Sequence, residues 1–242
     1  MALITFIVVV QARMGSTRLP GKVLMDLEGY KLIDHVLHRA LAPLDQSKGG
    51  VVLATTTNSV DNELVDYVSS TYSIPVTRGP EDYVLGRFIQ ALDEHGGEAE
   101  FVVRITADDP LRDNTIAYSA VDTLGENKAL VAAVNDSVAK FPLGVETEVC
   151  RADALRSLES SQPSPEIQEH IFPYFRNLPD HLIHRIGAPD NARVGEALTI
   201  DTVEDITRLR TLVREASSKI GKSPLDLNWS EVLTYKIIGL GE

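Results

Sequence analysis

The stretch Ile4-Thr-Phe-Ile-Val-Val-Val-Gln-Ala-Arg-Met-Gly-Ser-Thr-Arg-Leu-Pro-Gly-Lys22 decides the fold. Its first part, Ile4 to Val10, is an apolar run rich in β-branched residues, which is typical of a strand buried on both faces of a parallel sheet. The remainder, Gln11 to Lys22, contains glycine, serine and proline and predicts a loop. A helix should follow, because apolar residues recur at helical spacing at Leu32, Val36, Leu37 and Ala40.

Strands and helices continue to alternate along most of the chain. We expect strands at Val51–Ala54, Ile74–Val76, Phe101–Ile105 and Leu198–Ile200, and helices at Glu63–Ser69, Val84–Leu92, Val203–Ala216 and Trp229–Ile238. This alternation favours a three-layer α/β/α sandwich with a mostly parallel sheet.

The regular alternation of strands and helices is interrupted between about residues 135 and 195. This segment holds six prolines, with an expected strand at Val145–Val149 and expected helices near Ala152–Leu158 and Glu166–Arg176. We interpret 135–195 as a lobe inserted into a single domain, 1–242, that covers the sheet edge, contributes to the acceptor site or meets a partner chain.

Composition narrows the class of protein. The 242 residues carry a formal net charge of −12, so nucleic acids and anionic membranes would be repelled overall. The apolar start is shorter than a membrane span and lacks the marks of a signal peptide. Cys150 is the single cysteine, which fits a reducing compartment and a core role better than catalysis. We expect a cytoplasmic protein with no nucleic-acid or membrane partner.

The loop after the first strand has the chemistry of a phosphate cradle. Gly15 and Gly21 allow backbone amides to approach an anion, and Arg13, Arg18 and Lys22 supply three cations. The loop follows a buried strand, where ligands bind in open α/β sheets. It is neither a Walker A motif, because the spacing between its glycines is wrong, nor a dinucleotide fingerprint. The alternative is a solvated basic loop.

Two acidic positions follow other expected strands. Asp108 comes after Phe101–Ile105, and Asp201 comes after Leu198–Ile200. Carboxylates suit Mg²⁺, which binds one or two of them together with substrate phosphates. Asp108 could instead belong to a turn, and the pair Thr202 and Asp205 also predicts a helix cap, which is compatible with a metal role for Asp201.

Seven segments together resemble one known family. They are VVVQARMGSTRLPGKVL at 8–24, LATT at 53–56, RGPEDYVLGR at 78–87, VRITADDPL at 103–111, GVETEV at 144–149, EHIFPY at 169–174 and LTIDTVED at 198–205. Their order is similar to that of the spore-coat polysaccharide cytidylyltransferases, which are related to the 3-deoxy-manno-octulosonate cytidylyltransferases. The match covers nearly the whole chain, and the opening loop is its most specific part.

The resemblance implies a homodimeric nucleotidyltransferase of the glycosyltransferase-A type that uses CTP and Mg²⁺. Arg13 and Lys22 would contact the triphosphate, while Asp108 and Asp201 would hold the metal. Arg78 would lie near the base, where a guanidinium could donate to cytosine, although it could equally be a surface residue. The loop chemistry and the resemblance together give the expected nucleotide-binding set: Gln11, Ala12, Arg13, Gly15, Ser16, Arg18, Lys22, Thr55, Arg78 and Asp108.

Two departures from the family pattern concern the acceptor. Asp109 stands where the family usually has a cysteine, and Leu143 stands where it usually has a basic residue. Both lie where the acceptor pocket is expected, so the family's acceptor cannot simply be transferred. Candidate acceptor-binding residues are Lys140, Glu146, Glu148, His170 and Arg193, with a purely structural role as the alternative for His170.

The predicted reaction is transfer of CMP from CTP to a small anionic acceptor, with release of pyrophosphate. Positioning and charge neutralisation would supply most of the acceleration, without a protein nucleophile. An acidic sugar such as a 2-keto-3-deoxy sugar acid is the favoured acceptor, and a phosphonate or sugar phosphate is the alternative. A non-catalytic nucleotide-binding module also remains open, whereas the missing glycine fingerprint disfavours a dinucleotide-dependent oxidoreductase.

Overall fold

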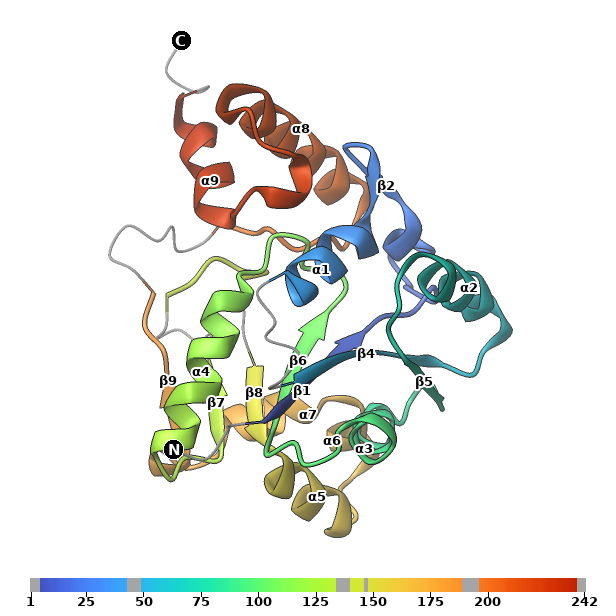
Figure 1. The fold of residues 1–242 in the computed structure, drawn as a ribbon, viewed down its shortest axis with the longest axis vertical. Helices are drawn as coiled ribbons and strands as arrows, with labels where there is room; N and C mark the ends of the chain where they lie inside the picture. Colours follow the sequence, from blue (N-terminus) through green and yellow to red (C-terminus); the bar gives the residue numbers. More distant parts are fainter. Residues whose placement is uncertain (1–4, 43–48, 134–139, 146–147, 189–195, 239–242) are drawn as a thin grey trace.

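The computed structural model describes residues 5–42, 49–133, 140–145, 148–188 and 196–238, which form a layered α/β fold (Figure 1). Within them, a seven-stranded sheet has the order β5-β4-β1-β6-β8-β7-β9. Its strands are β1 (Phe6–Gln11), β4 (Gly49–Thr56), β5 (Val76–Gly79), β6 (Phe101–Thr106), β7 (Val131–Ala133), β8 (Glu148–Arg151) and β9 (Ile183–Arg185). Only β8 runs antiparallel to its neighbours, so the prediction of a mostly parallel sheet is confirmed.

Helices cover both faces of this sheet (Figure 1). One face packs against α1 (Leu32–Leu41), α2 (Asn62–Thr71) and α4 (Asn114–Glu126). The other packs against α3 (Val84–His95), α5 (Ala152–Ser160), α6 (Pro165–Glu169) and α7 (Ile171–Arg176). A third cluster joins α8 (Val203–Ile220) and α9 (Trp229–Ile238) to the small hairpin β2 (Asp26–Leu27) and β3 (Tyr30–Lys31).

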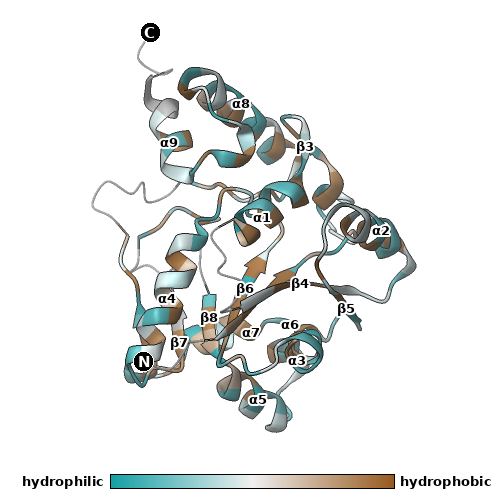
Figure 2. Ribbon diagram, in the orientation of Figure 1, coloured by the Kyte–Doolittle hydropathy of each residue, from teal (hydrophilic) through white to brown (hydrophobic). Residues whose placement is uncertain are grey.

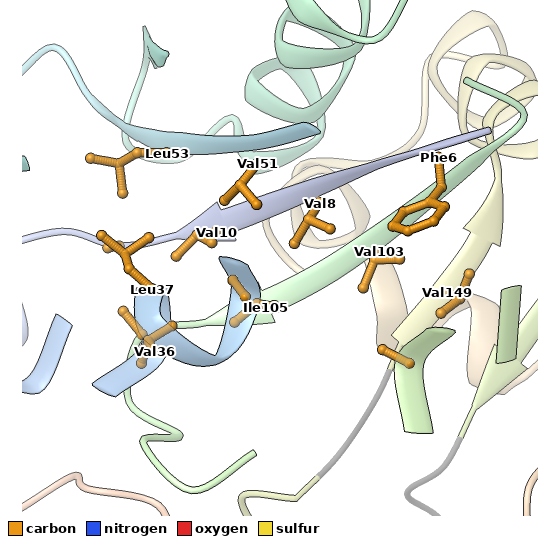
Figure 3. Packing of buried hydrophobic residues seen from close by; sticks show 14 of the residues in the cluster. Phe6, Val8, Val10, Val36, Leu37, Val51, Leu53, Val103, Ile105 and Val149 are labelled. Carbon is orange, nitrogen blue, oxygen red and sulfur yellow. The ribbon is translucent and has the colours of Figure 1, made fainter. Parts of the chain in front are cut away.

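Alternate residues of β1 explain why this strand lies at the centre. Val8 and Val10 point into the cluster with α1, while Ile7 and Val9 belong to the cluster beneath α3. Figure 3 shows Val8 and Val10 among apolar side chains of β4, β6 and α1. Because both faces of the strand are buried, an uninterrupted apolar sequence is needed there. The helices, in contrast, turn mixed surfaces outward (Figure 2).

Two expected elements differ from the structure. Residues Leu198–Ile200 form no strand: Leu198 N–H donates to the Leu143 carbonyl and Ile200 N–H to the Asp108 carbonyl, so their hydrogen bonds go to two separate segments. The helix expected at Glu166–Arg176 is two helices, α6 and α7, divided at His170. Pro173 explains this break, because proline has no N–H to donate and its ring clashes with the carbonyl four residues earlier.

The described part of segment 135–195 contributes two strands, β8 and β9, to the main sheet. β8 pairs with both β6 and β7, and β9 extends the edge beside β7. A role of this segment in dimerisation or acceptor binding stays a prediction. Among the helices of the described ranges, none combines the length and the apolar character that a bilayer span requires.

Four parallel strands, β5, β4, β1 and β6, end at the same edge of the sheet. The loop 12–22 after β1 and residues 107–113 after β6 therefore lie close together. Asp201 reaches the same edge, because the hydrogen bond from Ile200 N–H to the Asp108 carbonyl fixes the two segments side by side at 2.9 Å. The fold thus gathers three distant parts of the sequence at one place.

Candidate active site

The loop after β1 folds back on itself around the Met14 carbonyl. The N–H groups of Ser16 and Gly21 both donate to this oxygen, each at 2.9 Å. Gly21 has φ 72°, in the left-handed region that favours glycine, and the short helical turn Lys22–Leu24 follows it. This turn directs Lys22 back across the edge of the sheet.

A buried carboxylate fixes the start of the loop. Asp61 is 1% exposed and accepts from Met14 N–H at 2.6 Å through one oxygen. Its other oxygen accepts from the Thr56 hydroxyl at the end of β4. Because both carboxylate oxygens are used, Asp61 ties the loop to the neighbouring strand.

The Lys22 ammonium lies where the two acidic strand ends meet. Its Nζ donates to Asp108 Oδ2 at 3.1 Å, to Asp201 Oδ1 at 3.1 Å and to the Ile200 carbonyl at 2.7 Å. Arg18 adds a second cation at 3.0 Å from the same Asp201 oxygen. Carboxylates 93 residues apart in sequence therefore converge on one point, beside the cationic loop.

The positive charge of Lys22 favours the ionised form of Asp108. Burial raises the pKa of Asp108, but the attraction and hydrogen bond of Lys22 outweigh it and leave the pKa below its ordinary value. The Lys22 side chain is only 10% exposed, whereas that of Asp108 is 31% exposed, so the ammonium is shielded from water and the carboxylate is reached from the cleft. The arrangement holds one positive charge between two negative ones.

A cleft with a volume of about 390 Å³ opens beside these residues. It runs from the loop over the ends of β1 and β6 to the start of α3 and the α6–α7 junction. Nine of the predicted site residues line it: Gln11, Ala12, Arg13, Ser16, Arg18, Lys22, Asp108, His170 and Asp201. Five cationic side chains and three carboxylates line the cleft, so its net charge is +2 with histidine neutral, in a chain of net charge −12.

Other predicted nucleotide-binding residues lie outside the cleft lining. Thr55 is fully buried within β4. Arg78 donates to the carbonyls of Thr56 and Asn58, and so ties the end of β5 to the turn after β4. Gly15 is exposed on the loop.

The predicted acceptor residues are only partly brought together. His170 lines the cleft at the α6–α7 junction, whereas Lys140 is exposed outside its lining. Glu146 and Arg193 fall outside the described residues. Glu148 lies outside the cleft lining: it is 2% exposed, and its two oxygens pair with Arg104 and Arg176.

Asp109 also differs from the expectation. The sequence predicts an added charge in the acceptor pocket, but Asp109 is 4% exposed and pairs with buried Arg112 at 3.1 Å. Its side chain also accepts from the Thr106 hydroxyl at 2.6 Å. The extra carboxylate is therefore neutralised beneath the cleft rather than presented to a ligand.

Sequence reasoning missed two cleft-lining arginines. Arg104 and Thr106 of β6 lie on the face that points to the cleft, together with Gln11 of β1. Arg87 of α3 lines the cleft and donates to the carbonyls of Pro80 and Glu81. Period-two alternation from Arg104 through Thr106 to Asp108 was the available signal, because residues two apart in a strand share a face.

Comparison with known proteins agrees with this geometry. The model of the cytidylyltransferase family matches residues 7–221. The chain belongs to the cytidylyltransferase family. This cytidylyltransferase is therefore a CTP-dependent nucleotidyltransferase, which confirms the resemblance drawn from the motifs.

Individual relatives extend the match. The cytidylyltransferase is 31% identical over 231 residues to the spore coat polysaccharide biosynthesis protein SpsF of Bacillus subtilis, covering 93% of this chain and 91% of that protein. A solved cytidylyltransferase from Leptospira borgpetersenii has a TM-score of 0.79 at 23% identity, covering 96% of this chain and 93% of that one. CMP:2-keto-3-deoxy-manno-octonic acid synthetase complexed with CTP has a TM-score of 0.64 at 19% identity, covering 87% and 99%. The two structures establish the nucleotidyltransferase fold.

The donor set of this cytidylyltransferase fits a hard divalent cation. Asp108 and Asp201 present carboxylate oxygens to one position that a cation, the Lys22 ammonium, occupies in the structure. The described residues contain no cluster of three or more histidine, cysteine or acidic side chains placed to hold a metal. Two carboxylates completed by substrate oxygens suit Mg²⁺ better than an ion that needs an all-protein cage.

Proposed function

We propose that this cytidylyltransferase transfers CMP from CTP to an oxygen of a small anionic acceptor, most readily an acidic sugar such as a 2-keto-3-deoxy sugar acid. The observation that carries the proposal is the meeting of Asp108, Asp201 and Lys22 beside the cationic loop. The local net charge of +2 in the cleft supports two anionic substrates. The likeness to CMP:2-keto-3-deoxy-manno-octonic acid synthetase supports an acidic sugar as the acceptor.

The chain's own residues would act mainly by positioning. Loop 12–22 would bind the triphosphate through backbone N–H groups and the side chains of Arg13, Arg18 and Lys22. These cations would balance the charge that grows on the leaving pyrophosphate as the acceptor oxygen attacks the α-phosphorus in line. Arg13 would first exchange its ion pair with Glu81, which lies at 2.9 Å.

We propose Asp108 and Asp201 as the residues that hold Mg²⁺. A bound Mg²⁺ would neutralise phosphate charge and make pyrophosphate a better leaving group. The carboxylates would orient the ion's oxygen ligands, and Lys22 would turn toward the triphosphate. No protein nucleophile is required in this scheme, because the acceptor itself attacks.

A screen for pyrophosphate release tests the proposal. Each of CTP, UTP, ATP and GTP is combined with a keto-sugar acid, a sugar phosphate or a phosphonate, with Mg²⁺ present. We expect release that depends on CTP, on Mg²⁺ and on an acidic sugar. Turnover with a phosphonate alone would move the acceptor to the second class, and silence of every combination with folded protein would refute the proposed reaction.

A further inference from the structure

Arg104 is one of two cleft arginines that lie outside loop 12–22. Arg104 lies on β6, and its Nε donates to Gln11 Oε1 at 3.2 Å. Its Nη1 pairs with Glu148, which the adjacent strand β8 carries directly opposite Arg104. This guanidinium is therefore fixed from two sides, while its side chain remains 22% exposed to the cleft.

The support beneath Arg104 is buried and aromatic. Phe172 of α7 is 1% exposed, and the Arg104 Cζ lies 5.4 Å from the centre of its ring. The second carboxylate oxygen of Glu148 accepts a hydrogen bond from Arg176. Burial raises the pKa of Glu148, yet the two arginines outweigh it and keep the pKa below its ordinary value. The anchor is thus an ionised carboxylate.

One arm of the guanidinium has no assigned partner. Among the described residues, Arg104 donates through Nε and Nη1, and we find no hydrogen bond from Nη2. That nitrogen is not among the buried, unpartnered atoms of the described part, and Arg104 lines the cleft, so we infer that a ligand in the cleft can reach it. Arg87, the other cleft arginine outside the loop, is only 2% exposed, and its Nη1 donates to the carbonyls of Pro80 and Glu81.

We propose that Arg104 binds the anionic group of the acceptor through this free arm, and that Glu148 is the positioning residue that aims it. The inference deepens the proposed function and rests on it. A carboxylate and a phosphonate both offer oxygens to an arginine, so either acceptor class would use the same contact. The sequence predicts that Glu148 contacts the acceptor directly; in this proposal it acts on the acceptor only through Arg104.

Equilibrium binding separates this role from nucleotide binding. The protein is loaded with Mg²⁺ and α,β-methylene-CTP, which cannot release pyrophosphate, and titrated with 3-deoxy-manno-octulosonate or with methylphosphonate. Arg104→Gln should raise the Kd of the bound anion roughly tenfold or more, because a charge-assisted hydrogen bond is lost. The Kd of the nucleotide analogue should stay within about twofold. The anion that binds the parent protein identifies the acceptor class.

Two further variants test the anchor. Arg176→Gln removes the other arginine of Glu148 but leaves the cleft cation, so the Kd of the anion should change far less than in Arg104→Gln. Glu148→Gln should weaken anion binding while sparing nucleotide binding. Should Glu148→Gln not fold, Arg104→Lys replaces it. Lysine keeps the positive charge but lacks the guanidinium that Glu148 orients, so anion binding should again weaken.

The outcomes are distinct. Unchanged anion binding in Arg104→Gln, a loss confined to the nucleotide analogue, or no binding of either anion to the nucleotide-loaded parent protein would overturn the role of Arg104. Failure of the parent protein to bind the nucleotide analogue would instead refute the proposed function itself.

Discussion

Lys22 is engaged by all three of its N–H groups. They reach Asp108, Asp201 and the Ile200 carbonyl, and the side chain is almost fully buried. A phosphate contact therefore requires Lys22 to give up at least one of these acceptors. A divalent cation between Asp108 and Asp201 would take over the charge balance that the ammonium provides in the structure. Metal and lysine should thus compete for the same carboxylates.

Lys22→Met tests this competition. In the absence of nucleotide, Mn²⁺ should bind the variant about fivefold more tightly than the parent, because the competing charge at 3.1 Å is gone. With CTP and acceptor, kcat/KM should fall about 100-fold, because a phosphate cation is lost. Mn²⁺ binding is followed by electron paramagnetic resonance. Lys222→Met, which removes a lysine paired with Glu231 on the surface, should change neither quantity.

The cleft lining includes more of the predicted loop residues than of the predicted lobe residues. Arg13, Ser16, Arg18 and Lys22 are close in sequence, so one motif places them together. Whether an acidic residue faces solvent or a buried arginine depends on pairing across strands, which a single sequence does not reveal. Sequence alone therefore offers Glu148 as an acceptor residue, whereas in the structure its two oxygens pair with Arg104 of β6 and Arg176 of α7.

At the scale of elements, the conformation of loop 12–22 depends on Asp61, which lies at the start of α2. Asp61 begins α2 as its N-cap and bonds both Met14 N–H and the Thr56 hydroxyl. No loop motif contains Asp61, so nothing in the sequence connects this residue with the phosphate cradle. The structure shows that the cradle is shaped by its contact with the end of β4.

Asp61→Ala should loosen this loop. We expect the free energy of unfolding to fall by about 1–3 kcal/mol, since a buried donor loses its acceptor, and the KM for CTP to rise. Urea denaturation and initial-rate kinetics measure the two effects. Asp66→Ala, at an exposed position of the same helix, is the matched control and should leave both values unchanged. A normal KM in Asp61→Ala would contradict the anchoring role.

Elements were predictable where their pattern was long and regular. The helices α8 and α9 and the strand β6 begin at the predicted residues, and the capping box of Thr202 and Asp205 is confirmed. The helix α4 was missed, because its sequence is rich in small and hydroxyl-bearing residues. The strands β7 and β9 have three residues each, too few for alternation to be visible.

At the scale of the whole molecule, stability should depend on pH through His35. This histidine is fully buried, its Nε2 bonds the Leu27 carbonyl, and burial lowers its pKa from 6.5 to about 4. The unfolded chain binds more protons than the folded one between these values. The contribution of His35 to stability is therefore complete above pH 6.5 and is lost as the pH falls toward 4.

His35→Gln isolates this contribution. From pH 7 to pH 5, the parent protein should lose about 2 kcal/mol of unfolding free energy through His35, and the variant should lack this part of the slope. Glutamine can still donate to the Leu27 carbonyl. Denaturation at several pH values provides the measurement, with His181→Gln at an exposed position as the control. Parallel pH profiles of parent and His35→Gln would refute the buried neutral histidine.

Assembly is the second prediction at this scale. The family resemblance implies a homodimer, so light scattering at the concentration of the assay should give the mass of two 26.5 kDa chains. A single-chain mass under conditions of full activity would contradict it and would restrict every contact of the acceptor to one chain.

The position of the divalent ion tests the account most directly. A crystal structure with CTP and Mn²⁺, with the metal located by anomalous scattering, should show the ion bound by both Asp108 and Asp201, and the Lys22 ammonium turned to the triphosphate. An ion bound elsewhere, or Lys22 still lying between the two carboxylates with CTP in the cleft, would contradict the proposed site.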